Sequence, residues 1–167
     1  MRIEMKKLMT AAIASACCLA FTSSAPAQQA PADKAIADAV VGMTRAQWAA
    51  EMKDPANIAE MSKDMAEDYT EFNGDFATRI DGKALNSRLA EGVAKDSTRR
   101  TAAEMLNEKV QVYNGNVAIL TYNYAGTTID KDGKTNPGRA KSTRVYVKQG
   151  EKWVMVHANF ASDPLPK

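Results

Sequence analysis

The side chains of this 167-residue chain that could do chemistry are few and scattered. His157 is the only histidine, and histidine is the natural general base near neutral pH. No second titratable group accompanies it at a fixed spacing, so a half-buried histidine within a strand is the favoured interpretation. Met52, Met61 and Met65 also lack a histidine partner, which favours core packing over a soft metal site. The sequence thus contains no catalytic constellation and predicts neither a metal nor a cofactor.

Arg144 lies in the middle of a predicted strand, where its guanidinium would point toward the interior. An unpaired buried charge is very costly, so this group needs a partner. Two interpretations remain open. Arg144 is either half of a structural ion pair with Glu71 or Asp68, or the anchor of a ligand.

Polar side chains recur at every second position in two other predicted strands. Tyr69, Glu71 and Asn73 share one strand face, and Tyr122 and Tyr124 share another. If these faces line a cavity, they supply hydroxyl, amide and carboxylate groups around an apolar floor, as small-molecule sites do. Solvated outer faces give the same alternation, so the alternation alone does not separate the two. The predicted ligand-binding residues are Tyr69, Glu71, Asn73, Tyr124, Arg144 and His157.

Three helices are expected in the first two thirds of the chain. Apolar residues at helical spacing predict the first over residues 33–51, with Asp33 as its N-cap. Asp54-Pro55 would open the second, because proline suits the first turn of a helix. The apolar face of this second helix would consist of Ile58, Met61 and Met65. The third helix is predicted over residues 83–94.

Most of the remaining chain is expected to form strands. They are predicted at residues 69–73, 102–113, 117–128, 142–148 and 152–160. Asn114-Gly115 favours a tight hairpin turn because both residues tolerate positive φ, whereas residues 130–139 are expected to form a mobile polar loop. Helices followed by a run of antiparallel strands indicate an α+β fold with the helices on one face of a sheet. A sheet of long strands curved around a helix leaves a conical cavity.

The last third of the chain resembles a known superfamily. Thr143-Arg144-Val145-Tyr146, Lys152-Trp153 and Val156-His157 resemble the C-terminal half of nuclear transport factor 2-like proteins, in particular the association (hub) domain of calcium/calmodulin-dependent protein kinase II and its SnoaL-like bacterial relatives. A fainter likeness extends back to residues 69–72. The resemblance implies a cone-shaped α+β fold in which N-terminal helices pack against a strongly curved antiparallel sheet. It also implies a pocket between the two and homodimers or larger rings formed through the sheet.

The resemblance carries over only part of the hub pocket, which is lined by several arginines and an acidic residue. Arg144 matches one pocket arginine. The other arginine positions fall at Tyr124 and Phe160, and the acidic position falls near Asn73. The implied pocket is therefore less cationic than that of the hub, which weighs against carboxylate binding of the hub type.

The first residues of the chain have the pattern of an export signal. Lys6 and Lys7 precede an uncharged run over residues 8–20, and Ala25-Pro26-Ala27 fits a signal peptidase site. A membrane anchor is the alternative, but a spanning helix needs about 20 apolar residues and this run breaks at Thr22. We expect residues 1–27 to be a cleaved signal peptide, residues 28–32 a disordered tail and residues 33–167 one domain.

After cleavage, the mature protein would begin near Gln28 and would be periplasmic or secreted. A lipid anchor is less favoured, because neither Cys17 nor Cys18 has an aliphatic residue three positions before it. Both cysteines leave with the signal, so disulfides and thiolate metal sites are excluded from the mature chain. The remaining basic and acidic side chains balance, so nucleic acid and anionic membranes are not expected as partners.

Two classes of function agree with these features. The first is an exported, non-enzymatic domain that binds a small organic ligand or self-associates. The second is an isomerase or cyclase of the ketosteroid isomerase or polyketide cyclase type, in which burial raises the pKa of a carboxyl base. Its base would be Glu71 or Asp68, and its donors Tyr69, Tyr124 and Arg144. The first is favoured because the sequence places no base and donor together.

Overall fold

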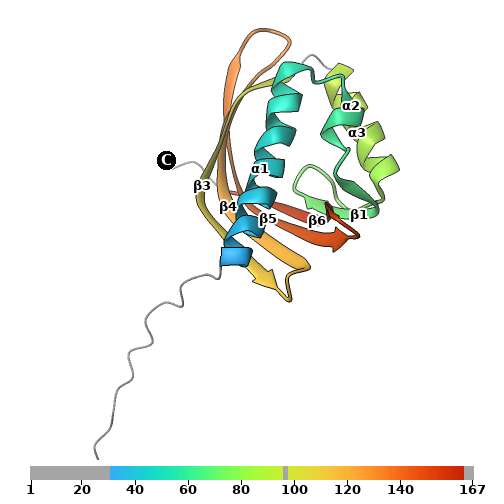
Figure 1. Ribbon diagram of the computed structural model, residues 1–167. Coiled ribbons are helices and arrows are strands. Elements are labelled where there is room, and N and C mark those ends of the chain that lie inside the picture. Colours follow the sequence, from blue (N-terminus) through green and yellow to red (C-terminus); the bar gives the residue numbers. More distant parts are fainter. Residues whose placement is uncertain (1–30, 96–97, 164–167) are drawn as a thin grey trace, which may run out of the picture.

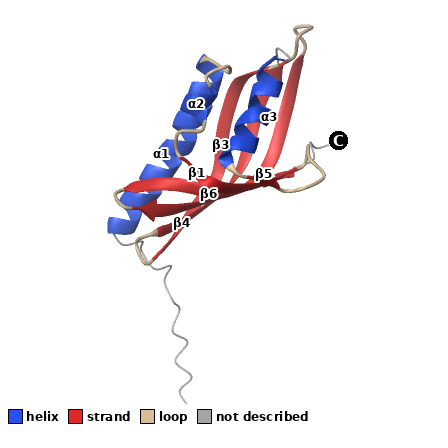
Figure 2. Cartoon of the chain, turned by 90° about the vertical axis from the view of Figure 1, so that its right-hand side faces the viewer, coloured by secondary structure: helices blue, strands red, loops and turns tan. Residues whose placement is uncertain are grey.

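The computed structural model describes residues 31–95 and 98–163. Within these residues, three helices pack on one face of a six-stranded sheet (Figures 1 and 2). The expected α+β class is therefore confirmed. The expected signal peptide and residues 28–30 of the expected tail lie outside the described residues.

Helix α1 (Pro31–Lys53) crosses the sheet and supplies the largest helical contribution to the core. Its buried residues Val40, Thr44 and Trp48 are spaced four apart, so they form one stripe. Pro31 begins the helix, a position that its fixed φ suits. Two details differ from expectation, since Pro31 and Ala32 are helical and Asp33 lies within the first turn rather than capping it.

The predicted second helix is wrong in extent. Asp54-Pro55 forms a turn in which the Asp54 carboxylate accepts a hydrogen bond from the amide of Ala56, and such local bonds compete with helix formation. Helix α2 (Ile58–Met61) starts only after Asn57 caps it and ends where Ser62 bonds back to Ile58. Met65, expected on the same helical face, instead begins a strand.

Helix α3 (Lys83–Lys95) agrees with the prediction to within one residue at its end. Gly82 precedes it with a φ of 89°, a backbone conformation that glycine adopts without strain. The helix contacts α2, β1 and β2, and none of its residues is buried.

The strands are longer than predicted, and one pairing is of a different kind. They are β1 (Met65–Asn73), β2 (Ile80–Asp81), β3 (Arg99–Tyr113), β4 (Val117–Ile129), β5 (Thr135–Gln149) and β6 (Lys152–Ser162). Their order in the sheet is β2-β1-β6-β5-β4-β3. All neighbours are antiparallel except β1 and β6, which pair in parallel although α3 and four strands lie between them in sequence. The sheet is thus mostly antiparallel.

The expected loop over residues 130–139 is wrong in its second half. Only residues 130–134 turn, and β5 already begins at Thr135. Pro137 is accepted within this strand because β6 reaches only as far as Ala140, which leaves the start of β5 with one free edge. The predicted turn at Asn114-Gly115 is confirmed, with φ values of 51° and 67°.

The two faces of the sheet differ in what covers them. Antiparallel partners lie on the same face, so the buried residues Leu120, Tyr122, Arg144 and Tyr146 all point toward α1. The alternate residues point to the opposite, outer face, and no described element covers that face (Figure 2). The core and the cavity both lie on the helical side.

Candidate functional site

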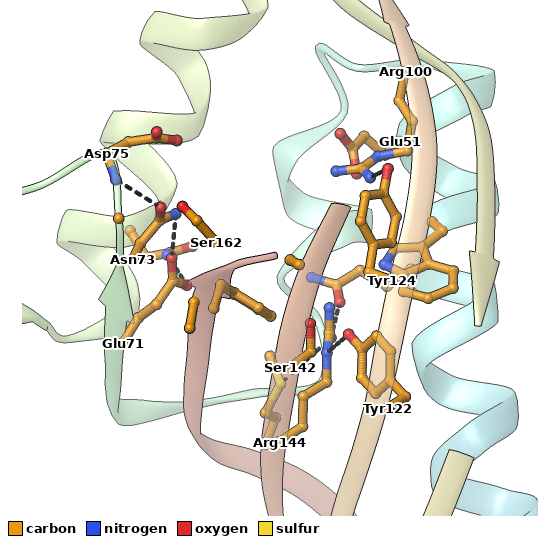
Figure 3. A pocket seen from close by; sticks show the side chains of 18 of the residues that line it. Glu51, Glu71, Asn73, Asp75, Arg100, Tyr122, Tyr124, Ser142, Arg144 and Ser162 are labelled. Carbon is orange, nitrogen blue, oxygen red and sulfur yellow. Dashed lines mark hydrogen bonds and ion pairs between the residues drawn. The ribbon is translucent and has the colours of Figure 1, made fainter. Parts of the chain in front are cut away.

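A cavity of about 370 Å³ opens between α1, α3 and the inner face of the sheet (Figure 3). Apolar side chains such as Trp48, Met155 and Phe160 form part of its wall. The polar groups gather in three clusters, around Arg144, around Glu71 and around Arg100. A largely apolar wall with a small number of positioned polar groups is typical of small-molecule sites.

Arg144 projects from the middle of β5 into the cavity, and its side chain is only 4% exposed. Its Nε donates to the hydroxyl of Tyr122 at 2.9 Å, and its Nη1 donates to the amide oxygen of Gln47. The guanidinium carbon lies 5.4 Å from the ring centre of Phe160, which adds a cation–π contact. All of these partners are neutral.

Of the two interpretations of Arg144 that the sequence left open, the ion pair is wrong for both candidate carboxylates, Glu71 and Asp68. Within the described residues no carboxylate oxygen lies within ion-pair distance of Arg144, and Asp68 is exposed and away from the cavity. Glu71 lies on β1, and β6 separates β1 from β5. Burial lowers the pKa of Arg144, but the neighbouring tyrosine hydroxyls raise it above its ordinary value, and the side chain is a cation.

Glu71 is 6% exposed, and three donors hold its carboxylate. Tyr69 donates to Oε2 at 2.7 Å and Asn86 to the same oxygen at 3.1 Å, while Asn73 donates to Oε1 at 3.0 Å. Burial and then the negative charge of Glu71 raise the pKa of Tyr69 well above its usual range, so Tyr69 remains a neutral donor. Hydrogen bonds from uncharged groups therefore stabilise this buried carboxylate.

Arg100 enters the upper part of the cavity from β3 (Figure 3). Its Nε lies 3.0 Å from a carboxylate oxygen of Glu51, and its Nη1 contacts the hydroxyl of Tyr124. Tyr124 also packs edge-on against Trp48, with ring centres 5.6 Å apart. Burial raises the pKa of Tyr124, although the charge of Arg100 opposes the shift. Unlike Arg144, Arg100 has an acidic partner.

Ser142 lies on β5 two residues before Arg144, on the same strand face. Its side chain is 5% exposed and lines the cavity. Among the described residues, its hydroxyl is one of the buried polar groups that make no hydrogen bond. A buried unsatisfied hydroxyl costs free energy, and one that faces a cavity can gain a partner there.

Five of the six predicted ligand-binding residues line the cavity, and they come from three strands. These residues are Tyr69, Glu71, Asn73, Tyr124 and Arg144. His157 does not. It pairs with Val145 on the outer face of the sheet, where its Nδ1 lies 2.9 Å from the Thr70 hydroxyl. A β-bulge between β5 and β6 shifts the register next to it, which strand alternation alone cannot reveal.

Several lining residues could not be assigned from the sequence. Gln47 and Glu51 belong to the same helix face as Trp48, and Arg100 and Asn86 approach from β3 and α3. With Arg139 at the rim, the cavity contains three arginines, more than the likeness to the hub implied. Glu51, Glu71 and Asp75 balance them in charge.

No group of three or more histidine, cysteine, aspartate or glutamate side chains is placed to bind a metal ion within the described residues. None of the described helices is long and apolar enough to cross a membrane.

The mostly antiparallel curved sheet, the helices on its inner face and the cavity between them define a nuclear transport factor 2-like domain. Residues 41–164 match the calcium/calmodulin dependent protein kinase II association domain family. The chain belongs to this family. No curated protein sequence matches the chain at a significant level.

Solved structures of the same fold are similar over nearly their whole length. The association domain of C. elegans CaMKII has a TM-score of 0.64 and 20% identity, over 78% of this chain and 98% of that one. The CaMKII hub homology domain of Chlamydomonas reinhardtii has a TM-score of 0.65 and 15% identity, over 77% and 99%. A nuclear transport factor 2-like superfamily protein of Salmonella enterica has a TM-score of 0.67 and 13% identity, over 80% and 95%. At these identities the likeness establishes the fold.

Proposed function

We propose that this protein is an exported domain that binds a small organic ligand with a carboxylate or carbonyl group, and that it self-associates through its sheet. The environment of Arg144 is the main support for ligand binding. A buried guanidinium that has only neutral partners and faces a cavity is stabilised when a ligand supplies the missing acceptor. The unpartnered hydroxyl of Ser142 lies on the same strand face and would donate to the same ligand group.

The enzymatic alternative has weaker support. Of its two candidate bases, only Glu71 lines the cavity. Tyr69, one of its candidate donors, bonds to Glu71 itself and so does not lie opposite that base. An isomerase needs its base and its oxyanion donors on different sides of the substrate. The arrangement therefore favours binding over proton transfer.

The role of Arg144 is tested with Arg144→Met, which keeps the length of the side chain and removes its charge. Butanoate serves as the probe, and Arg88→Met, an exposed arginine on α3 outside the cavity, serves as the control. Calorimetric titration should detect butanoate binding to the wild type and to Arg88→Met, and no binding to Arg144→Met.

The same variant distinguishes an anchor from a structural ion pair. Because no carboxylate is left without a partner, the melting temperature of Arg144→Met should stay close to that of the wild type. A loss of about 3–5 kcal/mol in the free energy of unfolding would instead indicate an ionic partner for Arg144 and would contradict the ligand-anchor role.

Self-association is supported by the outer face of the sheet. The cross-strand neighbours Tyr113, Val117, Ile119, Val145, Val147 and Val154 form an outer apolar patch there. None of these six side chains is fully buried, although all are large and apolar. An apolar patch on an uncovered sheet favours burial against a second copy. The relative from C. elegans is named an association domain, which agrees with this proposal.

Export is supported by the signal pattern in residues 1–27. It is tested by the intact mass of protein recovered from the periplasm or the medium of its own host. The expected species begins near Gln28 and carries no lipid. A species that retains Met1, or that carries acyl chains on Cys17 or Cys18, would contradict the proposal.

A further inference from the structure

A second cavity, of about 310 Å³, lies between α2, α3 and β1. Its wall is mainly apolar and includes Ile58, Met61, Ile80, Leu89 and Val93. It is not separate from the cavity at Arg144, because the side chains of Glu51, Glu71, Asn73 and Asn86 line both. Arg100 also lines both, so the two cavities meet between the Glu71 cluster and the ion pair of Glu51 with Arg100.

Helix α3 has an apolar stripe that the fold leaves without a full partner. Leu85, Leu89 and Val93 recur every four residues, so they share one side of the helix. None of the residues of α3 is buried, and Val93 is 55% exposed. Unburied apolar surface is unfavourable in water. Leu89 and Val93 face the second cavity, so an apolar molecule in that cavity would cover them.

The Glu71 cluster is suited to lie at the junction of the two cavities. Three donors already satisfy its carboxylate, so an apolar chain can pass it without leaving an unpartnered charge. Asn86 is the donor that comes from α3, and its bond to Glu71 ties that helix to the sheet at this point. The junction is thus a fixed feature of the site.

We infer that the two cavities form one bipartite site for an amphipathic ligand, with a carboxylate or carbonyl head at Arg144 and Ser142 and an apolar body between α2 and α3. This inference rests on the proposed function and specifies its ligand class. The head meets the buried cation and the unpartnered hydroxyl. The body covers Leu89 and Val93, and each cavity has the size typical of small-molecule sites.

The test compares butanoate, octanoate and octanol on the same protein, at concentrations below micelle formation. Octanoate has the same carboxylate head as butanoate and four more methylene groups. Each methylene that becomes buried makes the free energy of binding more favourable. Octanoate should bind at least about tenfold more tightly than butanoate, since a methylene in an apolar pocket is worth tenfold or more. Octanol lacks the anionic head and should bind at least about tenfold more weakly than octanoate.

Variants on α3 locate the body of the ligand. Leu89→Gln should reduce octanoate affinity to that of butanoate and leave butanoate binding unchanged. Leu85→Gln, one turn earlier on the same helix and outside both cavities, should leave both affinities unchanged. If Leu89→Gln fails to fold, Ala90→Phe serves instead, because Ala90 lines the second cavity and the larger ring would fill it.

The outcomes separate this inference from the proposed function. If butanoate binds through Arg144 and octanoate binds no more tightly, the bipartite site is wrong while the proposed function stands. If octanol binds as tightly as octanoate, the head is not held at Arg144 and the inference is overturned. If neither acid binds, the proposed function fails and the inference fails with it.

Discussion

At the scale of single residues, Arg144 and Glu71 are two buried charges that the protein stabilises in different ways. Glu71 accepts hydrogen bonds from three neutral donors, one of which is the buried hydroxyl of Tyr69. Arg144 donates to neutral acceptors and faces the cavity. The sequence predicts that the Arg144 side chain points inward, whereas the alternation around Glu71 fits either face of a strand. It does not predict Gln47 as a partner of Arg144 or Asn86 as a partner of Glu71, because these two residues come from α1 and α3.

Tyr69→Phe removes one of the three donors to Glu71. Hydrogen bonds to a charged group contribute about 1.5–3 kcal/mol, and Tyr69 is fully buried, so we expect the free energy of unfolding to fall by about 1–3 kcal/mol. Urea denaturation measures this loss. Tyr113→Phe, in which the ring is 47% exposed, should cost less than about 0.5 kcal/mol.

The same residue gives a pH dependence. The pKa of Tyr69 is raised in the folded protein, so its hydroxyl keeps its proton while the unfolded chain loses it above a pH of about 10. Its contribution to stability is therefore complete below that pH and declines as the pH rises further. The wild type should lose stability more steeply than Tyr69→Phe above pH 10. Parallel slopes for the two proteins would contradict a buried, neutral Tyr69.

At the scale of the elements, two neighbouring strands supply much of the site, because β4 contributes two tyrosines to its inner face and β5 contributes Ser142 and Arg144. Tyr122 and Tyr124 of β4 face Ser142 and Ala140 of β5 across the ladder. A pair of glycines, Gly126 and Gly138, continues the same ladder. The phenol of Tyr124 lies over Gly126, so the absence of a side chain there gives the ring its place beside Trp48.

Gly126→Ala should disturb the upper part of the cavity. The added methyl group would overlap with the phenol of Tyr124 and lie 2.8 Å from the carbonyl oxygen of Ala102. Overpacking of this kind costs about 1–3 kcal/mol. Because the displaced ring packs against Trp48, tryptophan fluorescence should change together with the midpoint of denaturation.

Gly138→Ala is the matched control, since Gly138 pairs with Gly126 and has no atom within 4 Å of the position of the new methyl group. It should be neutral or stabilising by up to about 1 kcal/mol, because alanine restricts the unfolded chain. Equal losses of stability in the two variants would contradict a destabilising overlap between the new methyl group at position 126 and the ring of Tyr124.

At the scale of the whole molecule, the two faces of the sheet have different tasks. The inner face holds the core and the cavity, and the helices cover it (Figure 1). The outer face presents the outer apolar patch, bordered by polar residues such as Thr121 and Thr143. Ligand binding and self-association can therefore occur on the same sheet without competing for residues.

Ile119→Lys places a charge in the middle of the outer apolar patch. If two copies bury this patch against each other, the charge must be desolvated, and the assembly should dissociate at micromolar concentration. Sedimentation of the wild type should give a dimer or a larger closed ring, and the variant should give a monomer. Ala39→Lys, on the exposed side of α1, should leave the assembly intact. A monomeric wild type would contradict self-association, and a dimeric Ile119→Lys would place the interface elsewhere.

The sequence by itself determined the class of the fold, the third helix and the turn at Asn114-Gly115. These features depend on the spacing of apolar residues along a helix and on the positive φ of Asn114 and Gly115, and both are properties of short segments. The tertiary structure alone decided the rest. The parallel pairing of β1 with β6 places Glu71 two strands away from Arg144. The β-bulge next to His157 shifts the register of β6, and His157 lies on the outer face of the sheet. Gln47, Asn86 and Arg100 reach the site because α1, α3 and β3 converge on one cavity, and contacts between distant segments cannot be read from the spacing of neighbours.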